Sequence, residues 1–338
     1  MIRRSALAAL AALALAACDK PAPTAAPAPS KPSAAVGPLR VAVVPKGTTH
    51  DFWKSVHAGA KKAEKELGGV TVTFQGPTKE DDRDQQVSLV QNLISAKYDA
   101  IVLAPLDSRA LVGPVRDAAA AKIPVVIIDS DLAATAGEDF VSFVATDNRA
   151  GGRLAGQRMG RALAGQGKVL LLRYQEGSAS TELRERGFTE GLSDFPGIRL
   201  IDPKRYAGPT RGSAQDAAEN LLVANPDIAG VFCPNESSAY GMLLALKSRG
   251  LAGKVVFIGF DASDAAVVAL REGHMEAIVL QNPIRMGYLG VKTAVEHLRG
   301  VKVDLRVDTG VMLVDKATMD TPEAGDLLSP NLDELLRP

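Results

Sequence analysis

Residues 45–53, PKGTTHDFW, place two aromatic rings, a histidine and a lysine directly after an apolar run. Aromatic residues make up only 4% of the 338 residues, and Trp53 is the one tryptophan. A core strand would continue apolar, and tryptophan is usually well buried, which argues against a solvent-exposed loop. Rings beside charged groups suit a ligand that has both an apolar face and hydrogen-bonding groups. The stretch therefore predicts one wall of a binding site.

Polar side chains also follow several other apolar runs that we interpret as strands. They are Asp129-Ser130-Asp131, Thr146-Asp147-Asn148, Asn235-Glu236, Asp261 and Gln281-Asn282. In parallel sheets covered by helices, ligands bind beyond the carboxyl ends of the strands. Any one of these residues could instead be a helix cap, Asp129 and Asn148 in particular. All of them together, beside Phe52 and Trp53, favour a shared polar site.

Short apolar runs alternate with helical patterns along almost the whole chain. We expect strands at residues 40–44, 70–74, 100–103, 125–128, 140–145, 168–172, 230–232, 255–259 and 277–280. Between them, stretches such as FWKSVHAGAKKAEKELG have apolar residues at three-to-four spacing, which is typical of helices. Strands that are apolar on both faces and separated by helices indicate parallel sheets covered on both sides. The predicted fold class is α/β.

The sequence lacks the patterns of the commonest catalytic and metal sites. His50 and His57 have no cysteine or further histidine at metal-binding spacing, and there is no G-x-S-x-G motif. The GQGK at residues 165–168 resembles a phosphate loop, but Ala162 and Val169 replace two of its required residues. It also precedes an expected strand, so we interpret it as a turn. We predict a protein that is not an enzyme and has no metal or cofactor.

The charge balance bears on whether the protein binds nucleic acid, and the cysteine content bears on its core. Lysine plus arginine equal aspartate plus glutamate at 39 each, so no basic field favours nucleic acid. The chain has two cysteines. Cys233 lies in the apolar run GVFCPN and is predicted to be a small buried hydrophobic residue.

The N-terminus has the layout of an export signal, with a basic start, a short apolar stretch and small residues at its end. Leu15-Ala16-Ala17-Cys18 resembles a bacterial lipobox, in which the cysteine is acylated and becomes the new N-terminus. An ordinary signal peptide with an incidental cysteine is the alternative. Residues 19–38 are rich in Pro, Ala and Ser and are expected to be a disordered tether. Asp19 resembles the signal that keeps some lipoproteins in the inner membrane.

From Leu39 to about Asp320 the chain resembles the periplasmic sugar-binding proteins of the ribose/galactose type, which serve ABC importers. The resemblance rests on FW after the first strand and on IPVVIIDSD, VATDN-RAGG, SxxxxLRERGF, VFCPNESSAYG, VVFIGFDAS and IVLQNP. It implies the type I periplasmic binding protein fold, two Rossmann-like domains joined by three crossovers with a ligand cleft between them. The implied division is a signal peptide at 1–18, a tether at 19–38, an N-terminal domain at 39–147 plus 282–310, and a C-terminal domain at 148–281 plus 311–338.

The same motifs imply which residues face the ligand. They are Phe52, Trp53, Asp129, Arg184, Tyr206, Asn235, Asp261 and Gln281, and we add Lys46, His50 and Ser130 from the ends of the first-domain strands. A sugar packs its C–H face on aromatic rings, and its hydroxyls donate to carboxylates and accept from a guanidinium. Packing of Trp53 into the core face of the first helix is the alternative for that residue.

Two features of the first domain depart from the ribose-type pattern. Ser130 stands where that pattern has an arginine, and Lys46 with GPT at residues 76–78 resembles the autoinducer-2 binders of the same superfamily. The second domain keeps the sugar pattern.

The expected function is that of a lipid-anchored periplasmic receptor, acting as a monomer. It would capture a monosaccharide or related polyol by cleft closure and deliver it to an ABC permease. A sensory protein that presents a sugar or an autoinducer-2-like signal to a membrane receptor is the alternative. A sugar-responsive repressor would need a DNA-binding helix-turn-helix before the first strand, where this chain has signal and tether.

Overall fold

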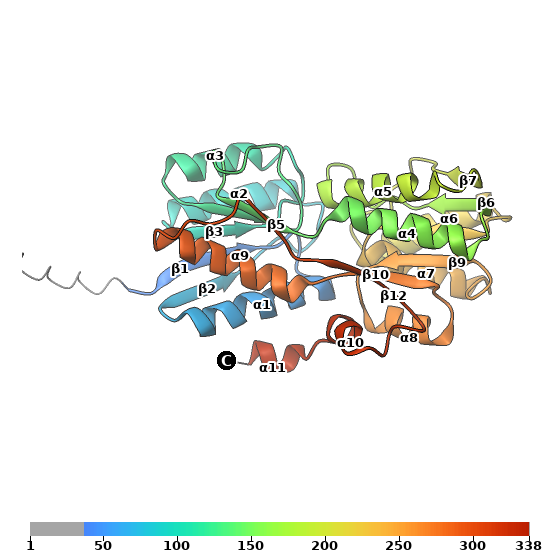
Figure 1. The fold of residues 1–338 in the computed structure, drawn as a ribbon. Coiled ribbons are helices and arrows are strands. Elements are labelled where there is room, and N and C mark those ends of the chain that lie inside the picture. The colour runs from blue at the N-terminus through green and yellow to red at the C-terminus, as the bar shows by residue number, and fades with distance from the viewer. Residues whose placement is uncertain (1–36, 338) are drawn as a thin grey trace, which may run out of the picture. The chain divides into compact units, whose positions relative to one another are not determined.

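The structure is a computed structural model that describes residues 37–337, in which helices and strands alternate (Figure 1). One sheet and its helices, which we call the first lobe, comprise β1 (Leu39–Val44), α1 (Asp51–Leu67), β2 (Val70–Phe74), α2 (Arg83–Ser95), β3 (Ala100–Leu103), α3 (Val112–Ala120), β4 (Val125–Ile128), β5 (Ser142–Ala145), α9 (Pro283–Leu298) and β11 (Arg306–Asp308). The second lobe comprises α4 (Asn148–Ala162), β6 (Gln166–Leu171), α5 (Ala179–Leu192), β7 (Gly197–Ile201), α6 (Arg211–Ala224), β8 (Gly230–Phe232), α7 (Glu236–Ser248), β9 (Val256–Phe260), α8 (Asp264–Glu272), β10 (Ala277–Gln281), β12 (Val311–Asp315) and α10 (Pro322–Leu328).

The two sheets have equivalent strand orders, β11-β5-β4-β3-β1-β2 and β12-β10-β9-β8-β6-β7. Each sheet is covered by helices on both faces. Alternate residues of a strand point to opposite sides, so both sets of side chains are buried. In β1, Val41 and Val43 pack against α1 and α9, whereas Ala42 and Val44 pack against α2 and α3. The predicted α/β class with two Rossmann-like lobes is confirmed.

Three strands were not expected, and all of them lie at sheet edges. β7, β11 and β12 are partly exposed along their length, so their sequences GIRLI, RVD and VMLVD lack a continuous buried run. Edge strands have one neighbour only, and an apolar pattern is a weak signal for them.

The chain passes between the sheets after β5, after β10 and between β11 and β12. The carboxyl ends of the two sets of parallel strands face each other. A segment that runs from β11 straight into β12 therefore approaches the interface in the first sheet and leaves it in the second. For this reason β11 is parallel to β5, whereas β12 is antiparallel to β10.

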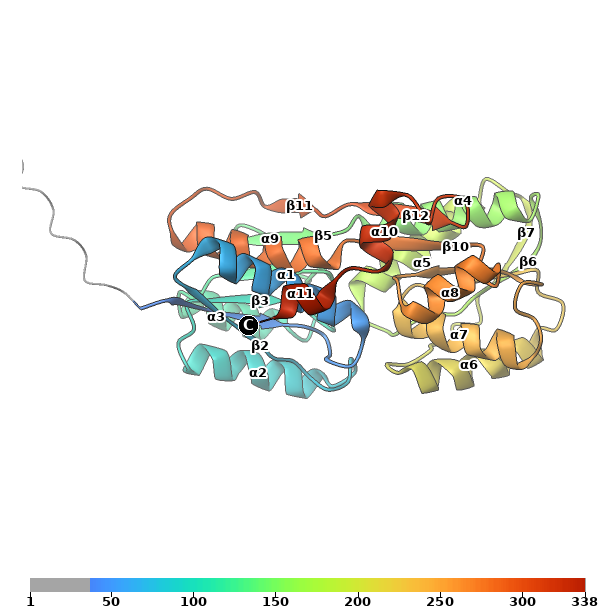
Figure 2. The same cartoon turned by 90° about the horizontal axis from the view of Figure 1, so that it is seen from below.

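The C-terminus returns to the first lobe. α10 buries Ala324 and Leu328 in the second-lobe core, but α11 (Leu332–Leu336) packs on α1, where Lys65 Nζ donates to the carbonyl of Arg337 (Figure 2). The expectation that residues 311–338 belong as a whole to the C-terminal domain is therefore wrong for this last helix. The helix contacts α1 of the first lobe, and a short segment after α10 lets the chain cross.

Candidate ligand-binding site

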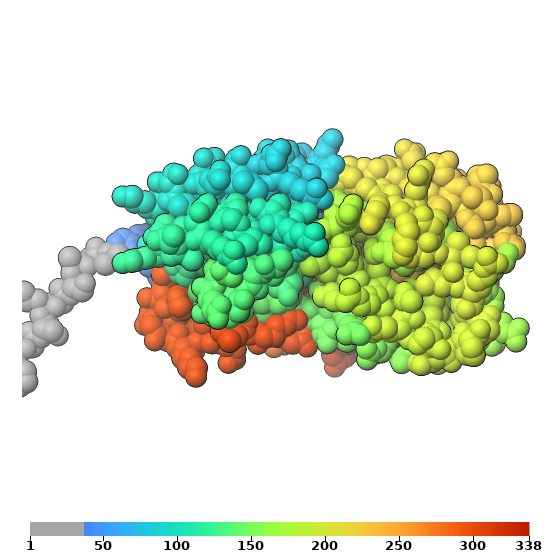
Figure 3. Space-filling model, turned by 90° about the horizontal axis from the view of Figure 1, so that it is seen from above, coloured from blue at the N-terminus to red at the C-terminus, as the bar shows by residue number. Residues whose placement is uncertain are grey.

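The facing carboxyl edges of the two sheets enclose one small polar cavity. Its walls consist of Lys46, His50, Phe52, Trp53, Glu80 and Asp129 from the first lobe and Tyr174, Ser180, Thr181, Arg184, Asn235, Glu236, Asp261 and Gln281 from the second. The free volume is about 30 Å³, far below the roughly 300–1,000 Å³ that is typical of ligand pockets. The two walls are thus in close contact, and the surfaces of the two lobes also meet on the face drawn in Figure 3.

A larger groove of about 540 Å³ lies at the opposite edge of the first sheet, where β4 begins. Its lining is mainly apolar and includes Val301 and Leu305, and its Asp139 is paired on the surface with Arg116 at 2.9 Å. The smaller cavity is the better candidate, because charged and hydrogen-bonding groups converge on it from both lobes.

Lys46 and Asp129 form the charged part of the first wall. Lys46 Nζ lies 2.7 Å from Asp129 Oδ2 and donates to Ser180 Oγ of the second lobe at 3.0 Å. Asp129 follows β4 with φ of 61°, in the left-handed region that a short polar side chain tolerates. Asp261, which follows the equivalent strand β9, has φ of 70°. Backbone strain of this kind clusters at functional sites, and here it aims both carboxylates at the cavity.

Glu80 holds the aromatic and imidazole part of the first wall. Its Oε1 accepts from the indole Nε1 of Trp53 at 2.6 Å and from Nδ1 of His50 at 2.7 Å. Burial alone would lower the pKa of His50, but the Glu80 carboxylate outweighs this and raises it. The same interaction lowers the pKa of Glu80 against the effect of burial. His50 is therefore an imidazolium at neutral pH, and its charge is balanced by Glu80.

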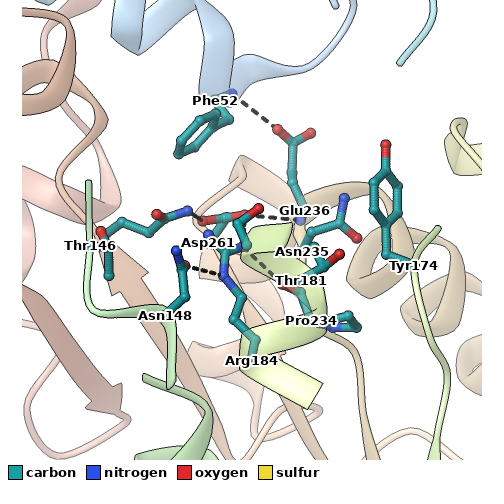
Figure 4. Close-up of polar contacts among 12 residues, drawn as sticks. Phe52, Thr146, Asn148, Tyr174, Thr181, Arg184, Pro234, Asn235, Glu236 and Asp261 are labelled. Carbon is teal, nitrogen blue, oxygen red and sulfur yellow. Dashed lines mark hydrogen bonds and ion pairs between the residues drawn. The ribbon is translucent and has the colours of Figure 1, made fainter. Parts of the chain in front are cut away.

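Arg184 is the centre of the second wall (Figure 4). Its Nε donates to Asn148 Oδ1 at 2.8 Å and its Nη1 to the carbonyl of Pro234 at 2.9 Å, while the guanidinium lies over the ring of Phe260. The backbones of α4 and α5 can approach each other closely because residue 152 is a glycine. A Cβ at Gly152 would lie 2.0 Å from the carbonyl oxygen of Arg184. The close packing of α4 on α5 thus fixes the guanidinium in place.

Asp261 joins Arg184 to the rest of the second wall. Its Oδ1 accepts from Gln281 Nε2 at 2.7 Å, its Oδ2 accepts from the backbone N–H of Glu236 at 3.2 Å, and Arg184 Nη1 lies 3.7 Å from Oδ2. Burial raises the pKa of Asp261 to about 6, although Arg184 and Gln281 oppose the shift. The carboxyl is mostly ionised at pH 7 and becomes neutral in mild acid.

The charged groups at the cavity are paired. The pairs are Lys46–Asp129, His50–Glu80, Arg184–Asp261 and Arg211–Glu236. Some hydrogen-bonding capacity is left over. Within residues 37–337, the buried atoms His50 Nε2, Arg184 Nη2 and Gln281 Oε1 have no hydrogen-bond partner. The site is electrically balanced and presents both donors and acceptors.

The structure brings most of the expected site residues to this cavity. Lys46, His50, Phe52, Trp53, Asp129, Arg184, Asn235, Asp261 and Gln281 line it. Ser130 lies just behind the wall, where its hydroxyl accepts from the N–H of Ser180 at 3.0 Å. Asn235 also caps α7, so the capping and the site interpretations both apply to it.

Tyr206 is an expected residue that neither lines the cavity nor lies directly behind its wall. It lies in the loop that follows the edge strand β7, is 40% exposed and contributes to a separate surface pocket. Its expected position in the cavity is corrected, because the loop after β7 places it beside the cavity, in a surface pocket that Tyr174 and Asp81 and Arg83 of the first lobe also line. The tyrosine that reaches the cavity is Tyr174, after β6.

Two roles were considered for Trp53, packing in the core and facing the ligand, and in the structure they fall to different residues. The Trp53 ring packs with Val41, Val56 and Met286 in the first-lobe core, and its edge reaches the cavity. Phe52 is only partly buried and meets Trp53 edge to face, with ring centroids 4.9 Å apart. The ring that is free to face a ligand is therefore that of Phe52.

Sequence reasoning missed Glu80, Tyr174, Ser180 and Thr181 as lining residues and did not select Glu236 among them. Tyr174 follows the apolar run that ends at Leu172, so the strand-end rule applied to the other sites would have pointed to it. Glu80 lies in KEDDRD, which reads as a solvated charged loop. Only the fold shows that this loop turns inward.

Two further properties concern the described part of the chain. Residues 37–337 include no group of three or more His, Cys, Asp or Glu side chains that could hold a metal ion. Among the helices of the same residues, none has the length and apolar character needed to cross a membrane. Cys18 and Asp19, expected to carry and to direct a lipid anchor, lie outside the described residues.

The chain is similar in sequence to known proteins. The periplasmic binding protein domain matches residues 41–302. The D-allose-binding periplasmic protein of Escherichia coli (strain K12) is 34% identical over 267 residues, which are 78% of this chain and 85% of that protein.

Two solved structures have a similar fold. An ABC transporter solute binding protein from Agrobacterium vitis with bound D-fucose is 39% identical, with a TM-score of 0.83. A carbohydrate transporter solute binding protein from Agrobacterium radiobacter in complex with D-arabinose is 36% identical, with a TM-score of 0.82. In both comparisons the match covers 86% of this chain and 99% of the solved chain.

Proposed function

The chain belongs to the periplasmic binding protein family, and from this premise we propose that it captures a neutral monosaccharide or related polyol between its lobes and delivers it to an ABC importer. The observation that carries the proposal is the combination of an aromatic ring at the cavity with buried donors and acceptors that have no partner within residues 37–337. A sugar satisfies such a set, since each hydroxyl both donates and accepts and the ring offers an apolar face.

The balance of charge favours a neutral ligand. Each cation at the cavity faces a carboxylate, so a buried ligand carboxylate or phosphate would find no uncompensated positive charge among the described residues. Burying an unpaired charge costs several kcal/mol, on the order of the whole affinity of a weak ligand. The relatives that were compared agree with this, because D-allose, D-fucose and D-arabinose are all neutral.

Capture would proceed by closure of the lobes around the ligand. The free volume of the cavity is too small for a monosaccharide, so entry requires the walls to separate. The bodies that we expect to rotate are residues 39–147 with 282–310 and residues 148–281 with most of 311–338. Rotation would be absorbed at the three crossovers, where Thr146 Oγ1 lies 3.2 Å from Thr309 Oγ1. A ligand favours the closed form only through contacts with both walls.

A thermal-shift screen tests the proposed ligand class. The panel contains pentoses, hexoses, inositols and autoinducer-2, each sugar paired with its sugar acid. A ligand that binds only the native state raises the melting temperature, and we expect this from a neutral compound. If only acids stabilise the protein, or none of the panel does, the proposal is wrong.

We also propose that the protein is a monomer anchored in the periplasm through lipid on Cys18, with Asp19 favouring the inner membrane. The support is the lipobox-like Leu15-Ala16-Ala17-Cys18 at the end of a short apolar stretch. Cys18→Ser should abolish metabolic lipid labelling and release the protein from membranes or leave its signal uncleaved. Unchanged labelling and membrane association in that variant would contradict the anchor.

A further inference from the structure

Glu80 occupies an unusual position for a carboxylate. It lies in the loop between β2 and α2 and is 5% exposed. Gly47 makes room for it, because a Cβ at that position would lie 2.8 Å from Glu80 Cγ. Within the first lobe, one carboxylate oxygen already accepts from both Trp53 and His50. The second oxygen, Oε2, points towards the second lobe.

The second lobe meets this oxygen with a tyrosine. The hydroxyl of Tyr174 donates to Glu80 Oε2 at 2.6 Å, and Gln175 Nε2 donates to the backbone carbonyl of Glu80 at 3.0 Å. Tyr174 is itself held in place, because its backbone N–H donates to the buried Glu185 at 3.1 Å. Two adjacent residues of one lobe thus bind the side chain and the backbone of a single residue of the other.

Several other polar contacts join the lobes, among them Lys46 to Ser180, Arg83 Nη2 to the carbonyl of Glu176 at 3.1 Å and Arg211 to Asp51 at 3.0 Å. Lys46 and Ser180 line the cavity and are available to a ligand, and the side chains of Arg83, Arg211 and Asp51 are partly exposed. Both oxygens of Glu80, in contrast, are already occupied by protein donors. Glu80 therefore has little capacity left for ligand hydroxyls, and its bond to Tyr174 depends on the separation of the lobes.

We propose that Glu80 is a latch for the closed state, engaged by Tyr174 and Gln175 when the lobes meet. Separation of the lobes removes the Tyr174 hydroxyl and leaves Oε2 to water, whereas closure restores a short buried bond to a charged acceptor, which is stronger than a neutral one. Because the same carboxylate orients Trp53 and His50, closure and the arrangement of the first wall are coupled. Glu80 is a positioning residue, and its effect on ligand retention rests on the proposed function.

Tyr174→Phe tests the latch with the smallest possible change, since it keeps the ring and removes only the hydroxyl. The matched control is Tyr206→Phe, in the same lobe but outside the cavity. Stopped-flow emission of Trp53 with the sugar found by thermal shift gives both rate constants. We expect dissociation to be about tenfold to a hundredfold faster in Tyr174→Phe, with association changed less than about twofold. Gln175→Ala should give a smaller increase in the same direction.

The outcomes separate the latch from the proposed function. If the sugar binds but Tyr174→Phe and Tyr206→Phe release it at the same rate, the latch is wrong and the receptor stands. If no sugar binds the wild type, small-angle X-ray scattering of the ligand-free variants still tests the latch. It predicts a larger radius of gyration for Tyr174→Phe than for Tyr206→Phe, and equal dimensions would overturn it.

Discussion

The two walls of the cavity are built from different chemistry, although the sheets that carry them have equivalent strand orders. The first wall combines the rings of Phe52 and Trp53 with the Lys46–Asp129 pair, and its tryptophan is also part of the lobe's core. The second wall is a series of polar contacts in which Arg184 forms an ion pair with Asp261 (both labelled in Figure 4) and Asp261 accepts a hydrogen bond from Gln281.

The difference indicates that the first wall contributes general affinity and the second wall contributes selectivity. Ring packing is tolerant of ligand identity, because every sugar has an apolar face. A polar wall with unpaired atoms at Arg184 Nη2 and Gln281 Oε1 is selective, because a ligand that leaves buried polar atoms unpaired is penalised. We therefore expect substitutions in the first wall to alter stability or general affinity and substitutions in the second to alter recognition.

Trp53→Ala should have the largest effect, and on stability. The ring is 3% exposed and packs in the first-lobe core, so its loss should lower the free energy of unfolding by about 3–5 kcal/mol. Urea denaturation measures this, and Phe52→Ala is the control, with a much smaller loss expected. Comparable stability losses for the two variants would show that the two rings do not divide the roles of core and ligand contact.

Arg184→Ala should remove ligand binding. Truncation leaves Asp261 buried without its cation, and such changes cost about 2–5 kcal/mol, a loss of about thirtyfold or more in affinity. Arg186→Ala on the same helix is the matched control, because Arg186 is exposed. Calorimetry that finds similar affinities for both variants, each with a native circular dichroism spectrum, would place the ligand elsewhere.

Phe52→Ala should weaken binding by about 1–3 kcal/mol, because its partly buried ring loses packing area against the ligand. The loss should be similar for every sugar that binds, as expected of the tolerant wall. A change in the rank order of sugars, measured by competition calorimetry, would assign selectivity to the first wall.

Acid should weaken binding through Asp261. Its pKa of about 6 in the folded protein means that affinity should fall about tenfold between pH 7 and pH 5, as the acceptor is protonated. Asp261→Asn should flatten this part of the profile. For folding the sign is opposite. A raised carboxyl pKa stabilises the folded state below about pH 4, and this contribution is lost as the pH rises through 6. A pH-independent affinity in the wild type would contradict the role of Asp261.

A site residue could be predicted from the sequence where a polar residue directly follows a strand. Asp129, Asp261 and Gln281 could be predicted because they directly follow continuous buried runs, and parallel topology brings such positions together. The interior strands were predictable for the same reason, since burial on both faces leaves a clear apolar signal.

What could not be predicted depends on contacts between distant segments. Glu80 lies in a charged loop, and its role follows from Gly47, Trp53 and Tyr174, which no local pattern connects to it. The edge strands and the return of α11 to α1 are likewise set by tertiary packing. Tyr206 shows the converse error, in which a motif position was transferred to a loop residue that lies in the neighbouring surface pocket and not in the cavity.

The central claim is that two electrically balanced walls close on a neutral sugar. The most direct test is calorimetric titration of the wild type at about pH 7.5 with the best neutral monosaccharide of the screen and with its uronic acid. We expect the acid to bind at least about tenfold more weakly, because its carboxylate would be buried without a free cation. Equal or tighter binding of the acid would contradict the account.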